Sequence, residues 1–97
     1  MATFIVLGNY TAQGIKAINE SPVRLDAARE AFATFGVSIK DFYLTFGQYD
    51  FVTVVEAPDA AAGAKALMVL GGQGNVSTVT LAALTEAEFR EVVSDLP

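Results

Sequence analysis

The chain has 97 residues, a length that fits one domain spanning residues 1–97, and 53% of them are hydrophobic while only 18% are charged. Soluble domains usually carry about 25% charged residues, so we expect the excess apolar surface to be buried in an oligomer interface. The sequence has no cysteine and no histidine, which excludes disulfides, thiolate nucleophiles and imidazole ligands, and we expect neither a metal nor another cofactor.

Charge and hydropathy argue against two further classes of partner. The net charge is −5 and the six Lys and Arg residues are scattered, so no basic stripe is present to neutralise nucleic-acid phosphates. No apolar run approaches the roughly 20 residues that cross a bilayer, and the first residues lack the positive start of a secretory signal. We therefore expect a soluble, cytoplasmic protein that binds neither nucleic acid nor membrane.

The first half of the chain predicts a strand followed by a helix. Residues 3–10 contain an apolar run of β-branched and aromatic side chains, typical of a strand buried on both faces. Residues 11–20 predict a short turn of helix, weakened by Gly14, and Ser21-Pro22 then has the pattern of an N-cap followed by the first helical residue. The helix has an apolar stripe and a glycine stop: Leu25, Ala28, Phe32, Phe35 and Gly36.

A β-hairpin is the clearest local prediction. Residues 37–46 and 49–57 are strand-like, and Gly47-Gln48 between them suits a type II′ turn, which pairs Leu44 with Phe51. One face of this hairpin is predicted to carry Phe42, Leu44, Phe46, Phe51 and Val55. The other face mixes apolar and ionisable groups: Asp41, Tyr43, Thr45, Asp50, Val52, Val54 and Glu56.

A second helix is predicted over residues 60–70, with Asp59 as its N-cap and a buried stripe of Ala64, Leu67 and Met68. The glycine-rich residues 71–74 follow this helix and include no lysine. A phosphate-binding loop opens a helix instead, so we expect this segment only to end the helix.

The last part of the chain predicts an edge strand and a final helix. Residues 75–84 form an alternating, threonine-rich segment that suits a sheet edge or an interface. Thr85-Glu86-Ala87-Glu88 matches a capping box. The helix that it opens is expected to pack back on the domain through its apolar residues Phe89, Val92, Val93 and Leu96.

The order of elements is β-α-β-β-α-β with an appended helix, which specifies an α+β fold, the ferredoxin-like plait with a four-stranded antiparallel sheet. The first and third strands are central in this fold, and they are the segments here that are apolar on both faces. Two helices cover only one face of the sheet. We therefore expect a homodimer joined through the uncovered sheet faces, because a second copy buries the same apolar patch on each subunit.

The chain resembles the GYD domain family, named for a glycine, a tyrosine and an aspartate that are Gly47, Tyr49 and Asp50 here. The likeness runs over nearly the whole chain, and its clearest segments are Gly8-Asn9-Tyr10-Thr11, Gln13-Gly14-Ile15-Lys16, Gly47-Gln48-Tyr49-Asp50-Phe51-Val52 and Glu56-Ala57-Pro58-Asp59. The resemblance implies a bacterial protein of the dimeric α/β-barrel group. That group includes cofactorless monooxygenases, small isomerases and ligand-sensing regulatory modules, which share a fold and not a reaction.

Two groups of polar residues are candidate ligand-binding sites. Around the hairpin turn, Asp50 lies beside Tyr49, with Gln48 at the tip and Tyr43 further along, so a carboxylate near phenols could act as a base. The structural alternative is that Asp50 accepts hydrogen bonds from backbone N–H groups. The second group lies where the first strand ends, in residues that are otherwise typical turn formers: Asn9, Tyr10 and Lys16.

Three functions remain open. The first is a small-molecule-binding or regulatory dimer, favoured by the two-faced apolar sheet and the missing histidine and cysteine. The second is a cofactor-independent enzyme for a small hydrophobic or aromatic metabolite, with Asp50 as the base and Tyr49 or Tyr43 as the donor. The third is a structural or protein-interaction module. Phenylalanine side chains between helices and sheet could line an apolar cavity in any of them, although core packing explains them as well.

Overall fold

The computed structural model describes residues 1–97, and its elements follow the predicted order. They are β1 (Ala2–Tyr10), α1 (Ala12–Lys16), a 3-10 turn (Ile18–Glu20), α2 (Ser21–Ala33), β2 (Ser38–Leu44), β3 (Phe51–Ala57), α3 (Ala60–Gly72), β4 (Val76–Ala83) and α4 (Glu86–Ser94). The strands form one antiparallel sheet in the order β2-β3-β1-β4. The α+β ferredoxin-like fold and the central position of the first and third strands are therefore confirmed.

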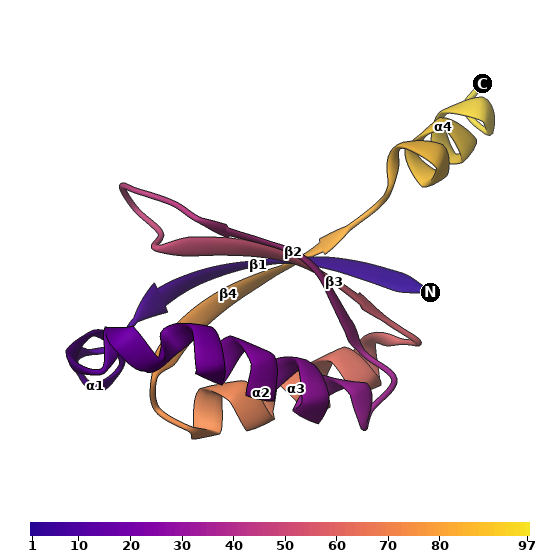
Figure 1. Ribbon diagram of the computed structural model, residues 1–97. Coiled ribbons are helices and arrows are strands. Elements are labelled where there is room, and N and C mark those ends of the chain that lie inside the picture. Colours follow the sequence, from indigo (N-terminus) through magenta and orange to yellow (C-terminus); the bar gives the residue numbers. More distant parts are fainter.

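The core lies between the sheet and the pair α2 and α3, which cover the same sheet face (Figure 1). Its fully buried residues come from the inward faces of the two central strands and from the two helices, with Val37 at the start of the hairpin: Val6, Phe32, Val37, Val55, Ala57 and Ala66. Burial of each valine or phenylalanine side chain in this set contributes about 1.5–3 kcal/mol. None of the helices combines the length and the hydrophobicity of a membrane-spanning segment.

The hairpin has the predicted register but a wider loop. Leu44 pairs with Phe51, and the Thr45 N–H donates to the Asp50 carbonyl at 2.8 Å. Gly47 has a φ of 98°, a value that favours glycine, but the loop runs from Phe46 to Tyr49 and is not the predicted two-residue type II′ turn. The strands end at Leu44 and Phe51, so Phe46 lies outside the sheet and is 93% exposed. Its predicted place on the hairpin face that carries Phe42 and Phe51 is wrong, because the ladder stops before reaching it.

Two helix predictions were partly wrong. Ser21 begins α2 without capping it, since the residue before it, Glu20, holds the cap position and the Ser21 hydroxyl bonds to the Tyr10 hydroxyl instead. Asp59 caps α3 as predicted, accepting from the Ala62 N–H at 2.8 Å. The buried face of α3 is centred on Gly63 and Ala66, while Ala64 and Met68 are exposed. Small residues face the sheet there because they let the helix approach the Phe4 ring closely.

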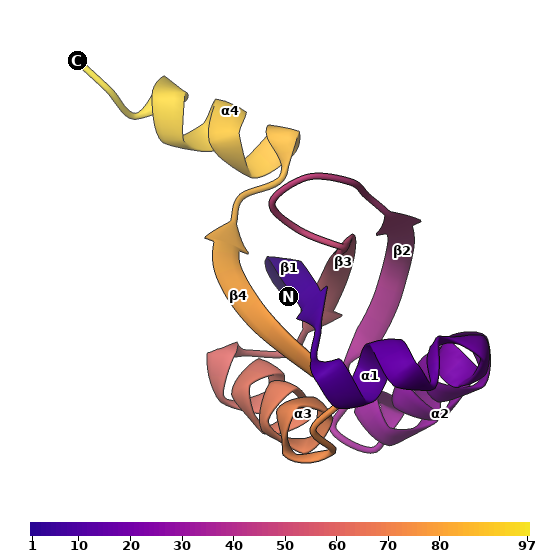
Figure 2. The ribbon, with the colours of Figure 1, turned by 90° about the vertical axis from the view of Figure 1, so that its left-hand side faces the viewer.

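The C-terminal helix α4 does not pack back on the domain, which corrects the prediction made from its pattern. The capping box is present, with Thr85 and Glu88 bonded to each other in both directions. The Thr85 backbone N–H donates to the exposed Glu88 carboxylate and holds the pKa of that group below its usual value. The helix has no buried residue and stands clear of the body, on the side of the sheet opposite α2 and α3 (Figures 1 and 2). Its apolar residues are exposed: Phe89, Val92, Val93 and Leu96.

The sheet face opposite α2 and α3 is apolar at its centre, and we call it the open face. On β1, Ile5 lies between Val54 and Leu81, and Leu7 lies between Val52 and Val79. Leu81 and Val79 on the edge strand are 46% and 49% exposed. No element of the chain covers this surface (Figure 2).

Candidate functional site

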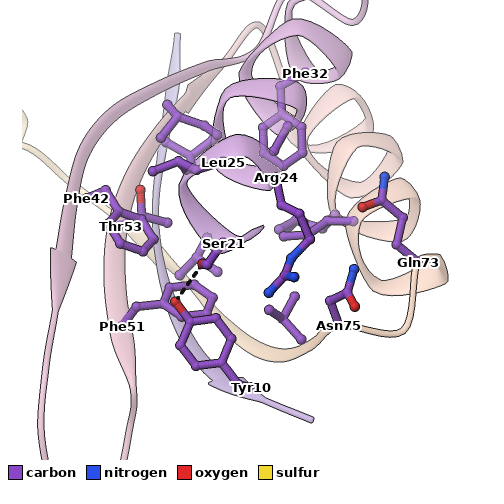
Figure 3. A pocket seen from close by; sticks show the side chains of 17 residues that line it. Tyr10, Ser21, Arg24, Leu25, Phe32, Phe42, Phe51, Thr53, Gln73 and Asn75 are labelled. Atoms are coloured by element: carbon purple, nitrogen blue, oxygen red, sulfur yellow. Dashed lines mark hydrogen bonds between the residues drawn. The ribbon is translucent and has the colours of Figure 1, made fainter. Parts of the chain in front are cut away.

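A pocket lies between α2, α3 and the covered face of the sheet, and its cavity volume is about 70 Å³, or about 630 Å³ when all the space open to solvent is counted. Twelve of its seventeen lining residues are hydrophobic, so the wall is mostly apolar. One side of the wall is aromatic. The Phe51 ring stacks on Phe42 with centroids 5.3 Å apart and lies 5.6 Å from the Tyr10 ring. Figure 3 shows these rings with Phe32 facing the cavity from α2.

Gly8 lets Phe51 take its place in this wall. The two residues are cross-strand partners on β1 and β3, and a Cβ added at Gly8 would collide with the Phe51 ring. The ring therefore lies over the glycine backbone, and Phe51 is almost fully buried. An aromatic side chain placed over a strand glycine stabilises the sheet at that point.

The pocket has one charged lining residue, Arg24 of α2. Its guanidinium donates to the Ala17 carbonyl at 2.8 Å and to the Gly14 carbonyl at 3.2 Å, which joins α2 to the end of α1. No carboxylate lies within ion-pair distance of Arg24. The Tyr10 and Ser21 hydroxyls, 3.2 Å apart, add a second polar point (Figure 3).

The helix α1 is held against the loop before β4, which contributes Gln73 and Asn75 to the pocket. The Thr11 N–H donates to the Asn75 carbonyl at 3.1 Å, and the Gln13 side-chain amide donates to the Asn75 side-chain oxygen at 3.0 Å. A Cβ at Gly14 would collide with the Asn75 carbonyl oxygen. The close approach of α1 to this loop therefore requires glycine at position 14.

The predicted group around Asp50 lies at the end of the sheet and outside the pocket. Asp50 accepts from the Tyr10 N–H through its carboxylate at 2.9 Å and donates its own N–H to the Gly8 carbonyl at 2.8 Å. Its side chain thus extends the β1–β3 ladder by one bond, as the structural alternative described. Tyr43 lies on β2 across from Val52 of the open face and is 60% exposed. Gln48 is exposed at the hairpin tip, and Tyr49 is half-buried beside it.

The second predicted group is also divided. Asn9 lies opposite Ser77 in the sheet, and Lys16 is exposed at the end of α1. Of the seven predicted site residues, Tyr10 alone lines the pocket, and the pair that the structure joins directly is Tyr10 and Asp50. The chain has no group of three or more acidic side chains placed to hold a metal ion.

Sequence reasoning did not select Ser21, Arg24 or Asn75, which supply polar groups to the pocket. Ser21 precedes a proline and has the pattern of a cap, and Arg24 follows Glu20 by four residues, the spacing of a helical ion pair. That ion pair is not formed, because the guanidinium turns to the α1 carbonyls. The direction of the Arg24 guanidinium is therefore visible only from the contact between α1 and α2.

Comparison with known proteins gives the family. The model of the GYD domain matches residues 4–93. The chain belongs to the GYD domain family. A relative from Thermus thermophilus, named glutamine synthetase and cystathionine beta-lyase binding protein, is 42% identical over 90 residues, which are 92% of this chain and 95% of the relative. The crystal structure of TTHA0845, also from Thermus thermophilus, covers 88% of this chain and 95% of its own, at 26% identity and a TM-score of 0.47.

Proposed function

We propose that this chain is a regulatory binding protein that works as a homodimer and binds a metabolic enzyme. The observation that carries the proposal is the 42% identity, over nearly the full length of both chains, to a protein named for binding glutamine synthetase and cystathionine beta-lyase. The exposed apolar surface supports it, because large uncovered apolar patches on soluble proteins mark interaction sites. The cytoplasmic location expected from the sequence stays a prediction.

The dimer is proposed to form through the open face. Its central residues are aliphatic, whereas its ionisable groups lie on the edge strand β2 and near the end of β3, where Lys40 and Glu56 pair at 3.7 Å. A second copy of the chain can cover this surface with the same residues, since an isologous interface joins the same patch on both subunits. The helix α4 stands on the same side of the sheet as the open face (Figures 1 and 2), so in such a dimer its apolar residues extend toward the second copy.

The enzymatic alternative has less support. A base needs a carboxylate that reaches a substrate proton, and the Asp50 carboxylate is engaged by the Tyr10 N–H at the end of the sheet. Neither Tyr43 nor Tyr49 shares a side-chain hydrogen bond with Asp50. A regulatory binding role requires neither a reactive carboxylate at Asp50 nor a tyrosine donor beside it.

Sedimentation velocity tests the dimer. We expect the wild-type chain at micromolar concentration to sediment as a species of twice its 10.2 kDa mass. The variant Leu81→Asp places a charge on the open face, so it should sediment as a monomer, with an unchanged circular dichroism spectrum. The control Met68→Asp changes an exposed residue on the outer side of α3 and should remain dimeric. A monomeric wild-type chain would contradict the proposal.

Surface plasmon resonance tests the binding role separately. The chain is immobilised, and purified glutamine synthetase, purified cystathionine beta-lyase and an unrelated purified enzyme are passed over it. We expect at least one of the first two to bind with a dissociation constant of about 10 µM or tighter, about −7 kcal/mol, and the unrelated enzyme not to bind. If neither enzyme binds at about 100 µM, a level at which a specific complex is normally detected, the enzyme-binding role is wrong whether or not the chain is a dimer.

A further inference from the structure

We infer that the pocket between α2, α3 and the sheet is a binding site for a small hydrophobic carboxylic acid, with Arg24 as the residue that recognises the carboxylate. The inference concerns the covered face of the sheet and does not rest on the proposed dimer or on the binding of an enzyme. It depends on three features of the pocket: an apolar aromatic wall, a single positive charge and free donors beside it.

The wall selects an apolar ligand. Phe42, Phe51 and the Tyr10 ring form a continuous aromatic surface, with centroid separations of 5.3 and 5.6 Å between neighbours. Ligand pockets in proteins are typically apolar with a few placed polar groups that fix orientation. A phenyl ring or a short alkyl chain suits this surface, because it buries apolar area on both partners.

The charge of the pocket selects an anion. The chain has eleven Asp and Glu residues and a net charge of −5, yet the pocket is lined by one arginine and by no acidic residue. Arg24 is partly buried and has no carboxylate partner within the protein. A partly buried cation without a counter-ion favours a bound negative charge, because a carboxylate restores the interactions that the guanidinium loses with water.

The guanidinium is held in place and still has donors to give. Two of its N–H groups bond to the Ala17 and Gly14 carbonyls, and an arginine has five. The remaining donors suit a carboxylate, and a side chain already fixed in position loses little conformational entropy when it binds. In the view of Figure 3 the guanidinium points into the space between Tyr10 and Asn75.

Asn75 supplies a further donor. Its side-chain oxygen accepts from Gln13, which identifies the other end of the amide as an NH₂ group, and no hydrogen bond within the protein uses that group. The Tyr10 and Ser21 hydroxyls bond to each other, and one proton of this pair remains free for a ligand. Arg24, Asn75 and the hydroxyl pair therefore each offer a hydrogen-bond donor, as recognition of a carboxylate requires.

Nuclear magnetic resonance titration of the full chain tests the inference. The probes are 3-phenylpropionate and octanoate, each compared with its uncharged primary amide. We expect the acids to shift the resonances of Tyr10, Asn75 and the Arg24 side-chain N–H, and to bind about tenfold or more tightly than the amides, the difference expected when one charge-assisted contact is lost. Arg24→Gln should remove this preference. The control Arg29→Gln, a change at an exposed residue 3.7 Å from Asp26, should keep it.

Two results would overturn the inference. Equal binding of acid and amide to the wild-type chain would show an apolar pocket without an anion site. No shift at the pocket residues with either acid at about 10 mM, where even a weak millimolar site is mostly filled, would show that this class of ligand does not bind. Because Arg24 also joins α1 to α2, Arg24→Gln could unfold that contact, and the comparison of acid with amide on the wild-type chain then decides the question alone.

Discussion

Asp50 extends the pairing of the two central strands with its side chain, and this contact gives a prediction for the residue. Asp50→Ala leaves the part-buried Tyr10 N–H without its acceptor, so we expect it to lower the free energy of unfolding by about 1–2 kcal/mol. Asp50→Asn keeps an acceptor oxygen at the same place and should cost less. Urea denaturation followed by circular dichroism measures both. An Asp50→Ala variant as stable as the wild type would show that the carboxylate does not stabilise the fold. That result would favour a role for the carboxylate in binding a ligand.

At the scale of single residues, the sequence indicated which side chains are polar and reactive, but not which of them lie close together. It selected Asp50 and Tyr10 in different candidate groups, and the structure joins them by one hydrogen bond. Arg24 lies outside the apolar stripe of its helix, but the helical pattern gives only the direction of a side chain and not which neighbouring turn lies in front of it. The contacts that hold α1 beside the pocket join residues up to 64 positions apart in the chain, such as Thr11 and Asn75, and no local pattern encodes them.

The docking of α1 against the loop before β4 gives a prediction for an element. In Gly14→Ala the new methyl group would meet the Asn75 carbonyl oxygen, a backbone atom that cannot rotate away. We expect α1 to be displaced and the free energy of unfolding to fall by about 1–3 kcal/mol, the usual cost of overpacking. Gly71→Ala is the matched control, since nothing lies within 4 Å of the added Cβ and alanine is the better helix former. It should raise stability by about 0.5–1 kcal/mol.

The elements themselves were well predicted, and the errors follow a physical rule. Alternation and turn chemistry predicted the hairpin register, and Asp59 and Thr85 predicted two helix starts, because these signals act over a few residues. The buried face of α3 was placed wrongly, since its sequence is apolar on most sides and the sheet selects the small residues. For α4 the amphipathic pattern identified an apolar face correctly, but such a pattern does not state which surface covers it.

At the scale of the whole molecule, element order alone predicted the plait. The two strands that are apolar on both faces are the central strands of the sheet. Helices bury one face of a central strand, and the other face is apolar where a second molecule is to cover it. The uncovered surface consists of the open face and α4, which lie on the same side of the sheet (Figure 1). The chain therefore has one covered side that holds a pocket and one side on which apolar residues are exposed.

If the proposed dimer forms, α4 should add to its stability, and this can be measured without truncating the chain. Phe89 and Val93 are one helical turn apart on the apolar face of α4, and both are exposed. Replacing both with serine removes apolar surface that a second copy would bury, and we expect the dimer to dissociate about tenfold or more readily, because tenfold corresponds to only about 1.4 kcal/mol.

The control for α4 changes two residues on its opposite side, Ala87→Ser and Glu91→Ser, and should leave the dimer dissociation constant unchanged. Sedimentation equilibrium over a dilution series measures the constant for each variant. Thermal unfolding of the monomer, measured in the Leu81→Asp background, should be the same with and without the serine pair, because α4 has no buried residue in the single chain. A serine pair that destabilises the monomer but not the dimer would instead place α4 against its own domain, as the sequence pattern first suggested.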